Sequence, residues 1–234
     1  MHLTSGIANP HSSIRKSRTS PACPFCTPPM KPRMRVLLLF PFLLMLGACS
    51  DSSTEAKAPV PEKPLDPITG RQAFQYTYPA ARGWASDAAP LRVRSILLEE
   101  MKTGEGKAAA WEITYVSMAR GAAKVYTWSA IEGQGSLHKG VFAGQEQSWR
   151  GDAQDHPFVP AALVVDTPDA LKKATAKSTA YLEKPGSKPP VNYLLELTPR
   201  FPSPTWRVLW GVSVGTAEHQ VFVDATSGAV VGAE

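Results

Sequence analysis

The pattern of hydrophobic and polar positions divides the chain into three parts. Residues 36–46 form an unbroken apolar run, whereas residues 50–67 are polar and rich in proline. From residue 68 onward, apolar positions recur at spacings typical of helices and strands. This pattern predicts a folded region over residues 68–234, preceded by a spacer and a short apolar segment.

Two segments of the folded region have the spacing of helices. The apolar face of the second comprises Leu171, Ala174, Ser178, Tyr181 and Leu182. We expect Thr167 to cap this helix, Pro168 to lie in its first turn and Lys184-Pro185-Gly186 to end it. The first helix is expected to begin near Thr69, and Pro79 is expected to kink it or end it early.

Strands are predicted after each helix, because those segments are rich in Val, Ile, Tyr and Trp and partly alternate. The expected strands are about 91–101, 110–118, 123–131, 191–198, 205–214 and 219–224. Each helix followed by its strands predicts an α+β fold, in which a helix crosses one face of an antiparallel β-sheet.

The two halves of the folded region look like copies of one unit. The matching blocks are Leu97–Met101 with Leu194–Leu197, Trp111–Ser117 with Trp206–Ser213, and Val125–Trp128 with Val221–Asp224. The second and third pairs are offset by 95 and 96 residues. We interpret this order and spacing as a duplication, with units at 68–150 and 151–234. Chance similarity between amphipathic strands is the alternative.

The apolar run has the features of an export signal. Cationic residues precede it, and its 11 residues are fewer than the roughly 20 that span a bilayer. It ends in Leu46-Gly47-Ala48-Cys49, which resembles the lipobox of bacterial lipoproteins. That resemblance implies cleavage between Ala48 and Cys49 and lipidation of Cys49. An ordinary secretory signal with a stray cysteine is the alternative.

The segment before this signal fits no signal peptide. Cys23-Pro24-Phe25-Cys26 has the spacing of a redox motif, but prolines surround it and no βαβ pattern follows. We interpret the residues before Met30 or Met34 as an over-extended gene model. Residues 1–48 are thus an extension plus signal peptide, and 49–67 are a lipidated cysteine with a proline-rich tether.

Removing the signal changes the charge of the chain. The whole sequence has a net charge of +5, but residues 1–48 contain six of its 25 Lys and Arg residues and no acidic residue. The remainder has 19 basic and 20 acidic residues, and we find no basic stripe in it, so a nucleic-acid partner is disfavoured. It retains only Cys49, so neither a disulfide nor a cysteine metal site is expected.

The C-terminal copy, Trp206–Trp210 through Val221–Val231, resembles the PepSY domain of bacterial envelope proteins. Asp224 can form an Asx-type turn, and Gly228 can supply the positive φ that such a turn needs. The first copy lacks this Asp-x-x-x-Gly turn, because Trp128 occupies the position that corresponds to Asp224. The resemblance implies a PepSY- or cystatin-like fold and a function by binding, for example in restraining proteases. It implies no catalytic residue and no cofactor.

Gly211–Gly215 matches GxSxG, the nucleophile elbow of hydrolases, with Ser213 as the nucleophile. That chemistry needs a helix after the serine and an acid before the histidine. Here a strand-like segment follows, and His219 precedes Asp224. A hydrolase using Ser213 is therefore only an alternative.

Other polar groups give weak signals. Asp152, Asp155 and His156 could hold a divalent metal, but no further ligand is close in sequence, which favours a solvated loop. His138 stands alone. Glu99 and Glu100 would face opposite ways on a strand, so an acid/base pair is not expected.

Tryptophan is frequent in the folded region. The six are Trp84, Trp111, Trp128, Trp149, Trp206 and Trp210. Core packing explains most of them, and lining of a peptide or glycan groove remains open for some.

Taken together, these features predict a non-enzymatic bacterial envelope lipoprotein without cofactor or metal. Ser50 follows Cys49, where enterobacterial lipoproteins retained in the inner membrane have Asp, so we expect an outer-membrane anchor facing the periplasm. We expect a protein or peptide partner, which an open sheet edge could bind by strand addition. The Ser213 hydrolase and a structural or assembly protein of the outer membrane are the alternatives.

Overall fold

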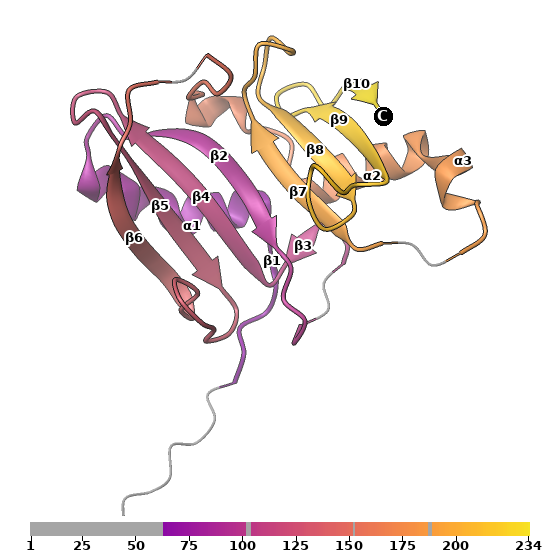
Figure 1. Ribbon diagram of the computed structural model, residues 1–234, viewed down its shortest axis with the longest axis horizontal. Helices are drawn as coiled ribbons and strands as arrows, with labels where there is room; N and C mark the ends of the chain where they lie inside the picture. Colours follow the sequence, from indigo (N-terminus) through magenta and orange to yellow (C-terminus); the bar gives the residue numbers. More distant parts are fainter. Residues whose placement is uncertain (1–62, 102–103, 152, 187–188) are drawn as a thin grey trace, which may run out of the picture. The chain divides into compact units, whose positions relative to one another are not determined.

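The computed structural model describes residues 63–101, 104–151, 153–186 and 189–234 (Figure 1). The predicted cleavage and lipidation site, Ala48 and Cys49, lies outside these residues. None of the helices in the described ranges is long and apolar enough to cross a membrane.

Each half contains a long helix followed by strands. The first contains β1 (Ile68–Thr69), α1 (Gly70–Trp84), β2 (Ala89–Ile96), β3 (Lys107–Ala108), β4 (Ala110–Ser117), β5 (Ala122–Ser129) and β6 (Gly140–Ser148). The second contains the 3₁₀ turn η1 (Pro160–Ala162), α2 (Thr167–Lys177), α3 (Thr179–Leu182), β7 (Val191–Glu196), β8 (Thr205–Trp210), β9 (His219–Asp224) and β10 (Val230–Ala233).

Eight strands form one antiparallel sheet in the order β10-β9-β8-β7-β2-β4-β5-β6 (Figure 1). The halves meet at the pairing of β2 with β7, and β1 pairs with β3 outside the sheet. Helix α1 packs on β2, β4 and β5, and α2 packs on β8 and β9, on the same face of the sheet. The predicted α+β class is therefore confirmed, and the strands form one large antiparallel sheet.

Alternate side chains of the strands point toward the helices, and together they form the core between the helices and the sheet. Trp111 on β4 and Trp206 on β8 are both fully buried. The Trp111 indole N–H donates to the Ile68 carbonyl at 3.0 Å, and that of Trp206 donates to the Val165 carbonyl at 2.8 Å. Each tryptophan thus ties a central strand to the segment that leads into a helix, and Gly70 lies against both indoles.

The start of α1 agrees with the sequence, and the start of α2 does not. Thr69 caps α1 and forms a capping box with Gln72. The cap of α2 is Asp166, so the expectation of Thr167 was wrong. Thr167 is the first helical residue, and its buried hydroxyl donates to the Gly106 carbonyl instead.

The helix ends also differ from the expectation. Helix α1 continues through Pro79 to Trp84. Pro79 and Gln75, whose carbonyl loses its helical donor, are both exposed, so water can replace the missing hydrogen bond. The second helix breaks at Ser178, where the amide bonds to Thr175 in a tighter turn and the hydroxyl donates to the Ala174 carbonyl at 2.7 Å.

Two predicted strands end four or more residues earlier than expected, and four strands, β1, β3, β6 and β10, were not predicted. Residues 97–101 lie beyond the end of β2, and residues 211–214 form a turn after β8. Leu97–Met101 therefore does not match Leu194–Leu197, most of which lies within β7. Strand β6 was missed because it is largely exposed on both sides and so lacks an apolar alternation.

The strand register corrects the internal alignment by one residue. Trp111 pairs with Trp128, whereas Trp206 pairs with Val223. Trp128 thus has the place of Val223, not that of Asp224. The common offset of β4 with β8 and of β5 with β9 is 95 residues.

The turn after β9 forms as expected. The Asp224 carboxylate accepts hydrogen bonds from the amides of Thr226 at 2.8 Å and Ser227 at 2.7 Å, and Gly228 has a φ of 74°. Burial acts to raise the pKa of Asp224, but hydrogen bonds from the backbone of Ser227, from Ser203 and from the backbone of Thr226 outweigh it, so the pKa is lowered. This carboxylate stabilises the β9–β10 hairpin.

Candidate functional site

The face of the sheet opposite α1 and α2, here called the open face, carries a continuous line of paired side chains. Because side chains alternate along each strand, Val93 points to the helices and its neighbours Arg92 and Arg94 to the open face. Successive pairings join one residue from each of seven strands. This transverse row is Phe142, Thr127, Glu112, Arg94, Leu194, Arg207 and Phe222.

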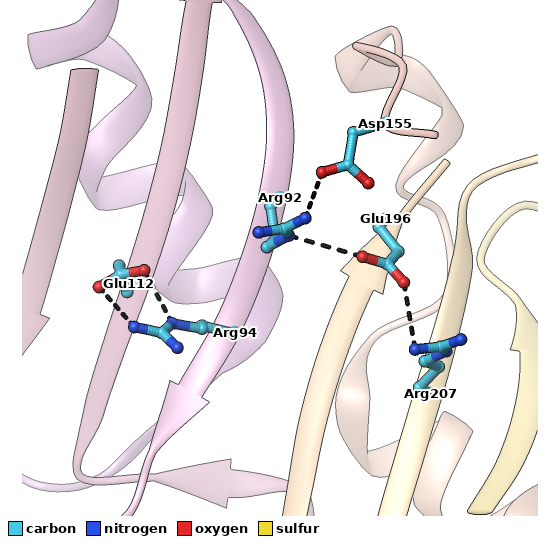
Figure 2. A network of polar contacts seen from close by, with 6 residues as sticks. All are labelled: Arg92, Arg94, Glu112, Asp155, Glu196 and Arg207. Atoms are coloured by element: carbon cyan, nitrogen blue, oxygen red, sulfur yellow. Dashed lines mark hydrogen bonds and ion pairs between the residues drawn. The ribbon is translucent and has the colours of Figure 1, made fainter. Parts of the chain in front are cut away.

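Charged side chains concentrate where the two halves meet (Figure 2). Arg94 donates twice to the Glu112 carboxylate, through Nε at 2.7 Å and Nη2 at 2.9 Å. Arg92 hydrogen-bonds to Asp155 from the connecting loop. Glu196 lies between Arg92 and Arg207, at 3.5 Å from Nε of the former and 3.4 Å from Nη1 of the latter.

These ion pairs differ in how well they are satisfied. The Arg94–Glu112 pair has the bidentate geometry of strong charge-assisted hydrogen bonds. The two contacts of Glu196 are too long for such bonds, and its side chain is only 10% exposed. The buried Nε of Arg92 has no hydrogen-bond partner within the described residues. The centre of the open face therefore holds guanidinium groups whose donors are incompletely used.

A groove of about 410 Å³ lies over this centre and is here called the seam groove. Its floor includes Leu194 and Asn192, and residues 212–215 of the β8–β9 hairpin line it as well. The complete lining is Arg92, Arg94, Ser95, Asn192, Tyr193, Leu194, Glu196, Arg207, Leu209, Val212, Ser213, Val214 and Gly215. The lining combines cationic, polar and aliphatic groups, which suits recognition of a polar ligand.

A second groove adjoins the first. Val212 lines both grooves, and the rest of the second lining is aliphatic except for the carboxylate of Glu99: Leu97, Leu98, Glu99, Met101, Pro190 and Val191. Val212 is 72% exposed. The seam groove thus continues past Val212 into a second groove beside the end of β2 and the start of β7.

The structure does not bring together the groups that the Ser213 alternative needs. Ser213 Oγ is exposed and lies 2.9 Å from the hydroxyl of Thr216. His219 Nε2 lies 2.8 Å from the hydroxyl of buried Ser178 at the end of α2, and its ring stacks on Tyr181. Ser213 is nonetheless part of the site, because it lines the seam groove.

Asp155 and His156 lie in the loop that connects the two halves, as the sequence favoured. Asp155 binds Arg92, and the His156 amide donates to the Leu197 carbonyl at 3.0 Å, which ties the loop to the end of β7. Asp152 lies outside the described residues. His138 Nδ1 lies 2.6 Å from Glu132. Within the described ranges, no group of three or more His, Cys, Asp or Glu could hold a metal ion.

Glu99 and Glu100 lie in the turn after β2, so the expectation that they are strand neighbours was wrong. The turn leaves them exposed. Four of the tryptophans, Trp111, Trp128, Trp206 and Trp210, belong to the core. None of the six tryptophans lines either of these two grooves.

In the sequence, Arg92 and Arg94 flank Val93, which predicts only a half-exposed strand. Nothing in the sequence pattern pointed to Glu112, Glu196 or Arg207 as members of a site. The i, i+2 spacing of Arg92 and Arg94 was the available signal, since it places two cations on one face of a strand. Their partners could not be found without the pairing of β2 with β7, which joins residues about 100 positions apart.

Comparisons with known proteins do not assign this chain to a family. No family model matches the sequence, and no curated protein matches it. The resemblance to PepSY domains is therefore not confirmed. Among solved structures, a "putative lipoprotein" from Clostridium difficile 630 aligns with 74% of this chain and 99% of its own. The sequence identity is 7% and the TM-score is 0.42, so this similarity establishes neither a shared family nor a shared function.

Proposed function

We propose that this protein is a lipid-anchored, non-catalytic envelope protein that binds a protein or peptide partner through the open face of its sheet. The carrying observation is the asymmetry of that sheet. Both long helices cover one face, and the other presents the transverse row and the seam groove.

The composition of the open face supports binding. Arginine is enriched at the energetic centres of protein interfaces, where its planar group can engage a partner carboxylate or carbonyl. Three arginines gather at the centre of this face, and exposed aliphatic residues of the β8–β9 hairpin lie beside them. Aliphatic and arginine side chains in one groove favour a polypeptide ligand over a small apolar one.

The sheet edges offer a second route to the same partner. Strand β6 is a nine-residue edge strand, and a partner strand could pair with its outer side. A register shift interrupts β6 opposite the segment 124–126 of β5, and such irregularities disfavour regular strand addition. The open face is therefore the better candidate, and the edge is secondary.

The remainder of the proposal rests on the sequence. Cleavage before Cys49 and its lipidation would attach the protein to the outer membrane on the periplasmic side, with residues 50–67 as a tether. We also propose that the halves are two PepSY-like copies. The equivalent burial of Trp111 and Trp206, with each indole bound to the segment before a helix, supports a common origin.

The test is a pull-down from solubilised envelope with the full lipidated chain. Thr114 lies on the open face of β4, and Thr114→Trp would place a bulky side chain there. The matched control is Thr175→Trp, because Thr175 is an exposed residue of α2. Cys49→Ala, which removes the lipid site, shows whether capture depends on membrane attachment.

The expected result is one specific partner retained by the wild type and Thr175→Trp and lost by Thr114→Trp. Recovery of no partner would contradict the proposal and favour a structural role in the outer membrane. Equal capture by both tryptophan variants would show that the open face is not the binding surface. A hydrolytic activity abolished by Ser213→Ala would overturn the non-catalytic assignment.

A further inference from the structure

The seam groove opens where β2 and β7 separate. The register between these strands covers three residue pairs, from Arg92 with Glu196 to Arg94 with Leu194. Beyond them the Ser95 side chain replaces the backbone pairing, because its hydroxyl accepts from the Tyr193 amide at 2.9 Å. The seam groove thus lies where the backbone pairing between the two halves ends.

Arg207 is held in this groove by packing. Its side chain is 22% exposed, and its guanidinium carbon lies 5.1 Å from the centre of the Phe222 ring. Its ion pair with Glu196 is 3.4 Å long, and its guanidinium group donates no hydrogen bond to any residue in the described ranges. A guanidinium fixed on an aromatic ring, with its donors unused, is prepared to bind an anionic group.

Arg94 supplies a second fixed cation in the same transverse row. Two of its nitrogens bind Glu112, which fixes the plane of the guanidinium, and the side chain is still 52% exposed. Leu194 lies between Arg94 and Arg207 in the row. Two strand spacings separate the arginine backbones, or about 10 Å.

The unused guanidinium donors of the groove favour an anionic ligand, although Arg92, Arg94 and Arg207 are balanced in charge by Glu112, Asp155 and Glu196. The lining of the groove holds three guanidinium groups and one carboxylate, that of Glu196. The nearby carboxylates are outside the lining and each has its own arginine: Glu112 binds Arg94 and Asp155 binds Arg92. Glu234 interacts electrostatically with Arg207, but it forms its ion pair with Arg200.

The hairpin beside the groove strengthens this preference. Its residues 211–217 carry no charge, and Val212 and Val214 line the groove. Apolar surroundings lower the local dielectric constant and strengthen an ion pair formed beside them.

We propose that the seam groove binds an extended, acidic segment of the partner protein, with carboxylates on Arg207 and Arg94. This inference rests on the proposed function and specifies its ligand. In an extended chain, side chains at positions i and i+2 face the same way about 6.8 Å apart, and the arginine side chains can cover the remaining distance. A single phosphate would reach one arginine and leave the Leu194 floor uncovered.

The test measures binding of two labelled, capped peptides of five residues, all glutamate or all glutamine, by fluorescence anisotropy. The protein is the full chain with Cys49→Ala. The test variant is the double substitution Arg94→Gln and Arg207→Gln. The matched control is Arg82→Gln, because Arg82 is an exposed arginine of α1. Far-ultraviolet circular dichroism checks that every variant is folded.

The expected result is binding of the glutamate peptide at least about ten-fold tighter than the glutamine peptide, since charge-assisted hydrogen bonds to two arginines are lost with glutamine. The double variant should lose this preference and Arg82→Gln should keep it. Equal affinity of the two peptides, or an unchanged preference in the double variant, would overturn the inference. Displacement of the peptide by inorganic phosphate at equal concentration would also overturn it, because the groove would then be a general anion site.

The pull-down shows whether only the acidic-segment inference is wrong or the proposed function as well. If wild type and the double variant capture the same partner equally, the open face can still bind it, and the acidic-segment inference alone is wrong. If the wild type captures no partner, the proposed function itself is wrong.

Discussion

The Asp166 carboxylate joins the starts of the two long helices, and its removal is the most informative test of the fold. One oxygen accepts from the backbone amides of Arg71 at 2.9 Å and Thr167 at 2.7 Å. The other accepts from the hydroxyl of Thr69, the cap of α1, at 2.6 Å. One side chain therefore caps α2 and places a negative charge at the N-terminus of α1.

The cost of Asp166→Ala can be estimated from these contacts. Loss of an N-cap costs typically about 1 kcal/mol. Loss of a carboxylate from a second helix N-terminus costs about 0.3–1 kcal/mol, and more where it is partly buried, as Asp166 is. Together they predict a decrease of roughly 2 kcal/mol in the free energy of unfolding. Asp166→Asn should cost about half of that, because an amide can still cap α2 but brings no charge to α1.

The assay is urea unfolding of the full chain with Cys49→Ala, followed by circular dichroism. The matched control is Asp169→Ala, because Asp169 is an exposed acid in the first turn of α2 and serves only that helix. Its removal should cost about 0.5 kcal/mol. An Asp166→Ala variant no less stable than Asp169→Ala would refute the idea that one carboxylate stabilises both helices.

Two further predictions concern single turns. Gly106 has a φ of 81°, and a Cβ there would lie 2.4 Å from the backbone nitrogen of Pro168, so Gly106→Ala should lower the unfolding free energy by about 3 kcal/mol or more. Gly135 has a φ of 69° with no atom within 4 Å of such a Cβ, so Gly135→Ala should cost only about 1–2 kcal/mol in the same urea assay; equal costs would contradict the close approach. The lowered pKa of Asp224 predicts stability that is fully present above its ordinary value of 3.8 and is lost as the pH falls through the lower folded-state value. Asp224→Asn should therefore lower stability at pH 7 and flatten its dependence below about pH 4; an unchanged acid-unfolding profile would argue against this contribution.

The elements with a strong apolar pattern were predictable from sequence. Strand β4 was found almost to the residue, since its alternate side chains, among them Trp111 and Ile113, are buried against the helices. Strand β6 was not predicted, because an edge strand needs no buried alternation. Whether α1 ends at Pro79 or continues through it was left open, since sequence does not reveal that this turn faces water.

The site was harder to predict than the fold. Pairing of Arg94 with Glu112 requires β2 beside β4, and the approach of Arg207 requires β7 beside β2. The cap by Asp166 likewise depends on two helix starts that meet in space. These are tertiary contacts between polar residues that carry no periodic signal of their own, so sequence patterns could supply the strands but not their juxtaposition.

The most direct test of the central claim is photocrosslinking in intact cells, with a photoreactive phenylalanine analogue at Thr114 on the open face and, separately, at Thr175 on α2. The account predicts a discrete adduct with an envelope protein from Thr114 and none from Thr175. Adducts from Thr175 alone, or none from either position, would contradict the claim that the open face binds a partner.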